Sequence, residues 1–197
     1  MVDDRAQMQT LESLIASSII VMVMVFTIDA TTLTPLTSST ANVHVEAELM
    51  ALGQDIFSVL DYPVNPGEIS PLKSDILGWN GNTTVWNGSA YNILNYTNPG
   101  DVNYSMSNNV TGLTSRIFVP RGIAHNLQVT YIFQGGTSTK AIIWNGDPSN
   151  NAIVVSRKIV IHDSEVSSGY SSRTGIQDVD ASVLYNVVEV RLVLWRM

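Results

Sequence analysis

The sequence predicts an α+β protein in which a long N-terminal membrane or filament-core helix is followed by a mainly antiparallel β-sheet head. Two patterns support this prediction. Residues 11–28 are almost uniformly apolar, as in a helix that is buried on all sides, whereas apolar and polar side chains alternate from residue 116 onward, as in half-buried strands. Only one segment has clear helical periodicity, so we expect the strands to be joined by turns and to pair antiparallel.

The apolar run at residues 11–28, LESLIASSIIVMVMVFTI, holds a single charge, on Glu12. As a helix it rises about 27 Å at about 1.5 Å per residue, close to the roughly 30 Å of a hydrocarbon core. We therefore predict a transmembrane or filament-core helix over residues 7–36. Ser13 and Ser17 lie four residues apart, a spacing that lets two helices approach closely.

The second half of the helical region has a one-sided pattern. Pro35 has no N–H to donate, so we expect a kink or a short break there. An amphipathic helix is predicted over residues 37–62, where Pro63 follows and ends it. Its apolar stripe should pack against the sheet of the head. The stripe consists of Val45, Leu49, Leu52, Ile56 and Val59.

The head is predicted to span residues 63–197. Its first part is rich in Gly, Asn, Pro, Ser and Thr, and should form only short strands or turns, at 76–79, 84–86 and 91–94. Longer strands are predicted at 116–119, 126–134, 140–144, 153–162 and 184–195. The last strand is apolar on both faces near its end, which favours a central, covered position. One face of that strand carries Val188, Val190, Leu192 and Leu194.

Composition excludes several classes of function. The chain has a net charge of −7, and 14% of its residues are charged, against roughly 25% in typical proteins. Between Arg5 and Arg116 the only basic residue is Lys73, so no basic patch can neutralise phosphates and nucleic acid is not expected as a partner. The absence of cysteine excludes disulfides, thiolate metal sites and thiol nucleophiles.

No catalytic residue, metal site or cofactor is predicted. His162, Asp163 and Ser164 have the residue types of a hydrolase triad, but neighbours on a strand point to opposite faces. The histidines, at 44, 125 and 162, lack paired ligand spacing. Several acidic residues could form a glycoside-cleaving pair or a Ca²⁺ site. The simplest interpretation is that they are scattered, solvated carboxylates. These are Asp61, Glu68, Asp75, Asp101, Asp147, Asp178 and Asp180.

Five Asn-X-Ser/Thr sequons lie between residues 82 and 111, in a polar stretch that is expected to be exposed. About three would arise by chance under the acceptor rule, so the clustering says more than the count. The candidate N-glycosylation sites are Asn82, Asn87, Asn95, Asn103 and Asn109. The aromatic residues of the same region should fill a small core, the alternative being stacking on sugars. They are Trp79, Trp86, Tyr91, Tyr96 and Tyr104.

The N-terminus has a short charged leader with Asp-Arg-Ala at residues 4–6, then Gln7, then Glu12 a few residues into the apolar helix. This arrangement resembles the precursor of an archaeal type IV pilin. The resemblance implies that a prepilin peptidase cuts between Ala6 and Gln7 and removes a candidate leader at residues 1–6. Glu12 then becomes the sixth residue, whereas the family has its glutamate fifth. Cutting after Gln7 would restore that position, with an unusual residue before the cut.

Both ends of the chain are also similar to an uncharacterised group of archaeal pilin-like membrane-anchored proteins. The N-terminal similarity lies in a Thr-Leu-Glu helix at residues 10–12 and in Thr-Pro-Leu at residues 34–36. The C-terminal similarity lies in a strand at residues 185–190 that closes on Trp-Arg-Met at residues 195–197. The middle of the chain is less similar.

These resemblances imply a non-enzymatic, type IV pilin-like structural subunit of an archaeal surface filament for adhesion, motility or secretion. Its implied partners are other pilin-like subunits through the N-terminal helix, the membrane, and prepilin peptidase. The head would lie outside the cell, on the membrane or in a filament. Glu12 is implied to pair with a neighbour's N-terminal ammonium, although a favourable interaction with the helix dipole explains it equally. The alternative function is a permanently anchored single-pass surface protein whose head binds a ligand or partner without polymerising.

Overall fold

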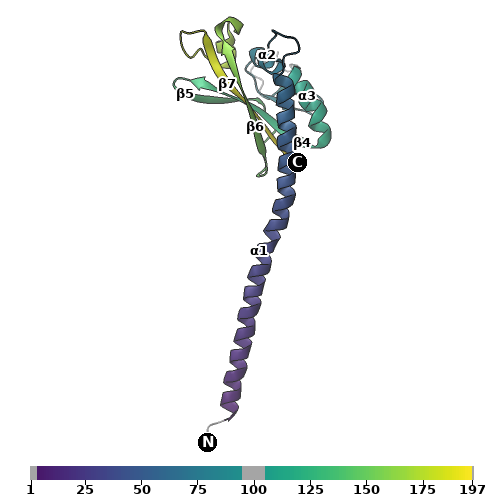
Figure 1. Cartoon of the computed structure of the whole chain (residues 1–197), viewed down its shortest axis with the longest axis vertical. Coiled ribbons are helices and arrows are strands. Elements are labelled where there is room, and N and C mark those ends of the chain that lie inside the picture. Colours follow the sequence, from purple (N-terminus) through teal and green to yellow (C-terminus); the bar gives the residue numbers. More distant parts are fainter. Residues whose placement is uncertain (1–3, 95–104, 197) are drawn as a thin grey trace. The chain divides into compact units, whose positions relative to one another are not determined.

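The computed structural model describes residues 4–94 and 105–196, with their side chains except those of residues 4–10, 26 and 28–41. The chain divides into two compact units, Met1–Val45 and Glu46–Met197, here termed the N-terminal unit and the C-terminal unit. Helix α1 (Asp4–Asp61) contributes residues to both units (Figure 1).

Within the part of the chain whose side chains are described, no helix is long and apolar enough to cross a membrane. The predicted transmembrane helix over residues 7–36 is therefore wrong. The predicted fold class, which began with a membrane helix, is corrected accordingly.

The C-terminal unit is built on one seven-stranded sheet with the spatial order β3-β2-β1-β5-β4-β7-β6. The strands are β1 (Thr84–Trp86), β2 (Tyr91–Ile93), β3 (Ser105–Met106), β4 (Ile123–Phe133), β5 (Gly136–Ile143), β6 (Ile153–His162) and β7 (Leu184–Arg196). A tight hairpin connects β4 to β5: Gln134 and Gly135 both have positive φ, which the two-residue turn requires.

The sheet is mixed, with one parallel pairing among antiparallel ones. β1 pairs with β5 in parallel through Thr84 and Ile143, whereas the other pairings are antiparallel. A parallel pair needs a long crossover connection. Here the chain passes through β2, β3 and β4 before it reaches β5. The parallel pair thus joins the short strands β1–β3 to the long strands β4–β7.

The sequence did not predict three short helices: α2 (Pro71–Leu77), α3 (Asn109–Ile117) and α4 (Tyr170–Thr174). The strand predicted at 116–119 is instead the end of α3 and the start of a 3-10 turn. A capping box explains α3: Thr111 N donates to Asn108 Oδ1 at 2.9 Å, and Asn108 N donates to Thr111 Oγ1 at 2.9 Å. Similarly, Ser70 caps α2, where Pro71 takes the first helical position.

One face of α1 packs on the sheet within the C-terminal unit. Gly53 lies closest, since a Cβ there would be 2.8 Å from Val155 Cγ2 and 3.2 Å from Leu194 Cδ1. The described α1 side chains that are buried in this unit are Leu49, Ile56, Phe57 and Leu60. Burial of the predicted stripe is thus confirmed at Leu49 and Ile56. It is wrong at Val59, which is 62% exposed.

Strand β7 lies between β4 and β6, so its predicted central position is confirmed. Its residues 188, 190, 192 and 194 are buried on the face toward α1, as expected. On the other face Val193 and Trp195 form a smaller buried cluster with Ala124. Two ion pairs connect α1 to the sheet: Asp61 with Arg157 at 3.5 Å, and Glu48 with Arg196 at 2.9 Å.

Candidate functional site

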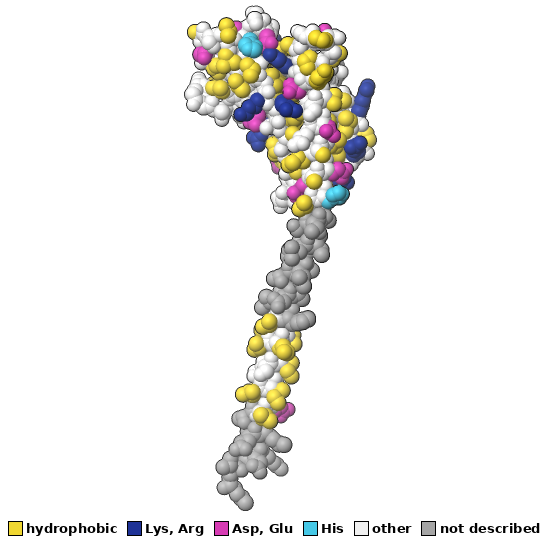
Figure 2. All heavy atoms as spheres, viewed as in Figure 1, with side chains coloured by type: hydrophobic (Ala, Val, Ile, Leu, Met, Phe, Trp, Pro, Cys, Tyr) yellow, Lys and Arg dark blue, Asp and Glu magenta, His cyan; other side chains and the backbone are white. Residues whose placement is uncertain are grey.

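Residues 11–25 of α1, here termed the apolar segment, expose more hydrophobic side chain than the surface of an ordinary soluble protein does. Ten of its side chains are large and hydrophobic, and each is between 51% and 76% exposed. They are Leu11, Leu14, Ile15, Ile19, Ile20, Val21, Met22, Val23, Met24 and Val25. Figure 2 shows them as a hydrophobic surface on the N-terminal unit. Contiguous apolar surface of this kind marks an interaction site.

Hydroxyl groups in and beside the apolar segment already have hydrogen bonds within the helix. Ser17 Oγ and Ser18 Oγ donate to Leu14 O at 2.9 and 2.8 Å, and Thr27 Oγ1 donates to Val23 O at 2.7 Å. A polar group that keeps its hydrogen bond costs little to bury. These hydroxyls can therefore move from water into an apolar contact without losing a partner.

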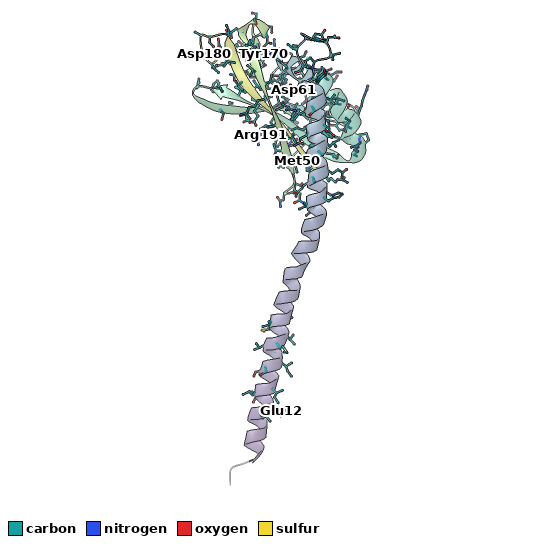
Figure 3. The ribbon with its side chains drawn as sticks, viewed as in Figure 1. Glu12, Met50, Asp61, Tyr170, Asp180 and Arg191 are labelled. Carbon is teal, nitrogen blue, oxygen red and sulfur yellow. The ribbon has the colours of Figure 1, made fainter. Side chains whose placement is uncertain are left out.

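Glu12 is the one charged residue of the apolar segment, and its side chain is exposed (Figure 3). A carboxylate that enters an apolar contact needs a cation or several donors to offset the loss of water. The side chains of Ala6 and Gln7, between which cleavage is predicted, lie outside the described part of the chain. Cleavage, and the pairing of Glu12 with a new N-terminus, stay predictions.

Three of the five sequons lie in the described residues, at Asn82, Asn87 and Asn109, whereas Asn95 and Asn103 lie outside them. Asn87 is exposed in the hairpin between β1 and β2, and Asn82 is half-buried just before β1. Asn109 begins α3, where its Nδ2 donates to Asp75 Oδ1 at 2.8 Å. The structure therefore places the three side chains in different surroundings.

A buried polar cluster, which the sequence did not reveal, joins β2, α3 and β4. The Tyr91 hydroxyl lies 2.7 Å from both Thr114 Oγ1 and His125 Nε2. Burial raises the pKa of Tyr91 to about 12 and lowers the pKa of His125 to about 4. The imidazole is therefore neutral at pH 7. The rings of Trp86 and Phe118 pack against the cluster, with centroids 5.0 Å from Tyr91 and 5.1 Å from His125 respectively.

The aromatic residues near the sequons contribute to this core where they are described. Trp79 and Tyr91 are buried, which confirms the core interpretation for both, and Trp86 is half-buried. Tyr96 and Tyr104 lie outside the described residues. A cavity of about 200 Å³ beside the buried polar cluster is lined by Trp86 and His125, among other residues. The hydrogen bonds of the cluster join β2, α3 and β4 beside this cavity.

The residues considered as a hydrolase triad lie at the start of a 3-10 turn after β6, beside an ion pair of Glu165 with Lys73. His162 ends β6, and its backbone N donates to Glu165 Oε2 at 2.8 Å. Lys73 Nζ donates to Glu165 Oε1 at 2.6 Å. Burial raises the pKa of Glu165, but the bonds from Lys73 and from His162 outweigh it and the pKa lies below its usual value. This contact ties α2 to the end of β6.

Several of the acidic residues considered for catalysis or Ca²⁺ binding bond to nearby backbone. Asp75 accepts from Val110 N at 2.8 Å as well as from Asn109, which fixes the start of α3 against α2. Asp178 Oδ1 and Asp180 Oδ1 accept from backbone N–H groups two residues further on, as in Asx-turns. Asp101 lies outside the described residues. Among the described residues no group of three or more His, Asp or Glu could hold a metal ion.

A comparison with known families gives the chain its classification. The model of DUF7288, a family of unknown function, matches residues 5–194, so the chain belongs to this family. The matched range includes both the apolar segment and almost all of the C-terminal unit. No curated protein and no solved structure matches the chain.

Proposed function

We propose that this member of the DUF7288 family is a non-enzymatic, type IV pilin-like structural subunit of an archaeal surface filament. In this role the N-terminal part of α1 packs against the same part of other subunits, and the C-terminal unit is presented outside the cell. The observation that carries the proposal is the apolar segment, whose ten large hydrophobic side chains are all more than half exposed. Burying them releases roughly 25 cal/mol for each Å² of apolar surface removed from water.

The distribution of these side chains favours a bundle of like helices as the partner. Consecutive residues from Ile19 to Val25 are all large and apolar, so they cover every side of the helix and not a single stripe. A groove on a globular partner would cover one side only. Several copies of the same helix surround each other on all sides, and the hydroxyls of Ser17 and Ser18 are already bonded within the helix.

The buried groups of the C-terminal unit agree with a structural role. Three described titratable side chains, His125, Asp75 and Glu165, each join one element of the fold to another. The resemblance of the N-terminus to archaeal pilin precursors agrees with assembly through α1, since Glu12 is the carboxylate that the resemblance assigns to pairing between subunits.

Assembly of the full chain tests the proposal. The protein purified from its own cells should form particles that sediment and that appear as filaments in electron micrographs. Met22→Glu should abolish them, because it puts a charge inside the helix bundle. Met50→Glu is the matched control, since Met50 is an exposed methionine on α1 within the C-terminal unit. It should leave assembly intact.

Two outcomes would contradict the proposal. One is a wild-type chain that stays monomeric at every concentration reached. The other is an equal degree of assembly in both glutamate variants, since the apolar segment would then have no special role.

A further inference from the structure

We propose that Asn87 is an acceptor for an N-linked glycan on the folded protein, and that Asn82 and Asn109 are not. The inference rests on the proposed function only for the placement of the C-terminal unit outside the cell. The capacity of each asparagine to accept a glycan depends on local geometry alone. Three sequons with the same motif occupy three different environments in the described residues, and these environments distinguish them.

The motif sets two requirements on the geometry. The nitrogen of the asparagine side chain becomes the glycosylated atom, so Nδ2 must be reachable and uncommitted. The motif also demands Ser or Thr two residues later, so the transferring enzyme must recognise that hydroxyl. A sequon in a folded protein can therefore act only where both side chains are accessible.

The Asn87 sequon meets both requirements. Asn87 and Ser89 are both exposed, in the hairpin that connects β1 to β2. A Cβ built on Gly88 would have no heavy atom within 4 Å, so the space around the turn is open. Asn87 Oδ1 accepts from Ser89 N at 3.0 Å and from Ala90 N at 2.9 Å. These bonds hold the amide by its oxygen, and Nδ2 has no hydrogen-bond partner among the described residues.

The hydroxyl of this sequon is equally accessible. Ser89 Oγ donates to Asn87 Oδ1 at 3.1 Å, and this bond is at the surface. Water or an enzyme can replace such a bond at little cost, because both side chains are exposed.

Asn109 is exposed, but its sequon fails at the hydroxyl, and its amide nitrogen is already bonded. Asn109 Nδ2 is already committed, since it donates to Asp75 Oδ1 at 2.8 Å. Thr111 is 4% exposed, and its hydroxyl belongs to the capping box that begins α3. Glycosylation here would require the first turn of α3 to unfold and to leave α2.

The Asn82 sequon fails because its hydroxyl is inaccessible. Thr84 is fully buried in β1, and its Oγ1 donates to Ile142 O at 2.9 Å. Asn82 is itself half-buried, and its carbonyl oxygen accepts from Trp79 Nε1 at 2.9 Å. The preceding Gly81 lies against the backbone of Arg173, where a Cβ would be 1.9 Å from the carbonyl oxygen. This sequon is therefore part of the packed sheet.

The reaction joins Asn87 to a sugar from a lipid-linked oligosaccharide. A bond forms between Asn87 Nδ2 and the anomeric carbon, and the bond from that carbon to the lipid phosphate oxygen breaks. The amide nitrogen loses one proton, and the lipid phosphate leaves. No oxidant or reductant is involved.

The test uses a purified oligosaccharyltransferase and a lipid-linked oligosaccharide, with the full chain carrying Asn95→Gln and Asn103→Gln. The enzyme is first chosen for its ability to glycosylate three isolated peptides that contain the Asn82, Asn87 and Asn109 sequons. On the folded chain, peptide mapping by mass spectrometry should find the glycan at Asn87 alone. Adding Asn87→Gln should remove all modification, whereas adding Asn109→Gln should leave the yield unchanged.

The inference is overturned by comparable modification at Asn82 or Asn109 in the folded chain, or by an unmodified Asn87. Circular dichroism of each variant shows whether the chain is folded, so a misfolded variant cannot be mistaken for a negative result. Because the assay needs neither assembly nor a location in the cell, its failure would leave the proposed filament role standing. Conversely, a chain that fails to assemble could still accept the glycan.

Discussion

Two stretches of the same helix, α1, use apolar residues in different ways. Within the C-terminal unit one face of the helix is buried on the sheet at Leu49, Ile56 and Phe57, while Met50 and Val59 remain exposed. In the apolar segment every described side chain is exposed, and the large apolar ones lie on all sides. The distribution of apolar side chains around the helix axis therefore says more about the partners of the helix than their number does. A one-sided helix completes the core of its own chain, whereas an all-round one needs several partners.

The largest effect on the C-terminal unit is expected from Phe57→Ala. Phe57 is buried at the contact between α1 and the sheet. Removing a buried phenylalanine side chain costs about 3–5 kcal/mol, which in a unit of this size lowers the melting temperature by roughly 6–20 °C. Scanning calorimetry of the full chain measures this change.

The matched control for Phe57→Ala is Val59→Ala, two residues further along the same helix. Val59 is mostly exposed, so the free energy of unfolding should change by less than about 0.5 kcal/mol. Similar losses in both variants would mean that α1 does not have the one-sided contact described here.

A smaller effect is expected from acidification. Burial lowers the pKa of His125 to about 4 from 6.5, so the unfolded chain binds a proton more readily than the folded chain between these values. The stabilisation is complete above about pH 6.5 and is lost as the pH falls toward 4, by up to about 3 kcal/mol in total. Urea unfolding followed from pH 7.5 to pH 4.5 should show the loss.

The variant His125→Gln isolates the contribution of His125 to the pH dependence of stability. It should lower stability at pH 7, because the contact with Tyr91 changes, but it should flatten the dependence on pH in this window. An unchanged slope in the variant would assign the acid sensitivity to other groups.

Glu12→Gln should have the smallest effect on the stability of the C-terminal unit. It should have a large effect on assembly. The residue lies in the N-terminal unit, so the melting temperature of the C-terminal unit should not change. If the carboxylate pairs with a neighbour's ammonium, the variant loses the charge assistance of that bond. The filament yield in electron micrographs should then fall sharply. A normal yield would favour the interaction of Glu12 with its own helix dipole.

Alternating patterns predicted the long strands well. Residues 153–162 form β6 as expected, and β7 extends one residue beyond the predicted 184–195. Local alternation suffices for β6, which has one buried and one open face, and for residues 188–192 of β7. The pairing of β1 with β5 depends on residues about sixty positions apart, which no local pattern can indicate.

The helices and the candidate sites were harder to predict. α2 and α3 lie in segments rich in Ser, Thr and Asn, which favour turns except where they cap a helix, as Ser70 and Asn108 do. The stripe on α1 was misplaced because the contact centres on Gly53, so Phe57 and Leu60 are buried in place of Val59. The sequence identified all five sequons, but which asparagine is accessible depends on the folded surroundings.

The parallel pairing of β1 with β5 has a consequence for how the C-terminal unit opens. Only Thr84 and Ile143 are in register between the two strands, and side-chain bonds supply much of the remaining contact. Thr83 Oγ1 donates to Ala141 O at 2.8 Å, and Trp86 N donates to Asn145 Oδ1 at 2.8 Å. The four long strands, by contrast, are paired along most of their lengths. Fewer ladder hydrogen bonds therefore hold strands β1–β3 than hold the long strands, and their amide protons should exchange with solvent before those of β4 and β7.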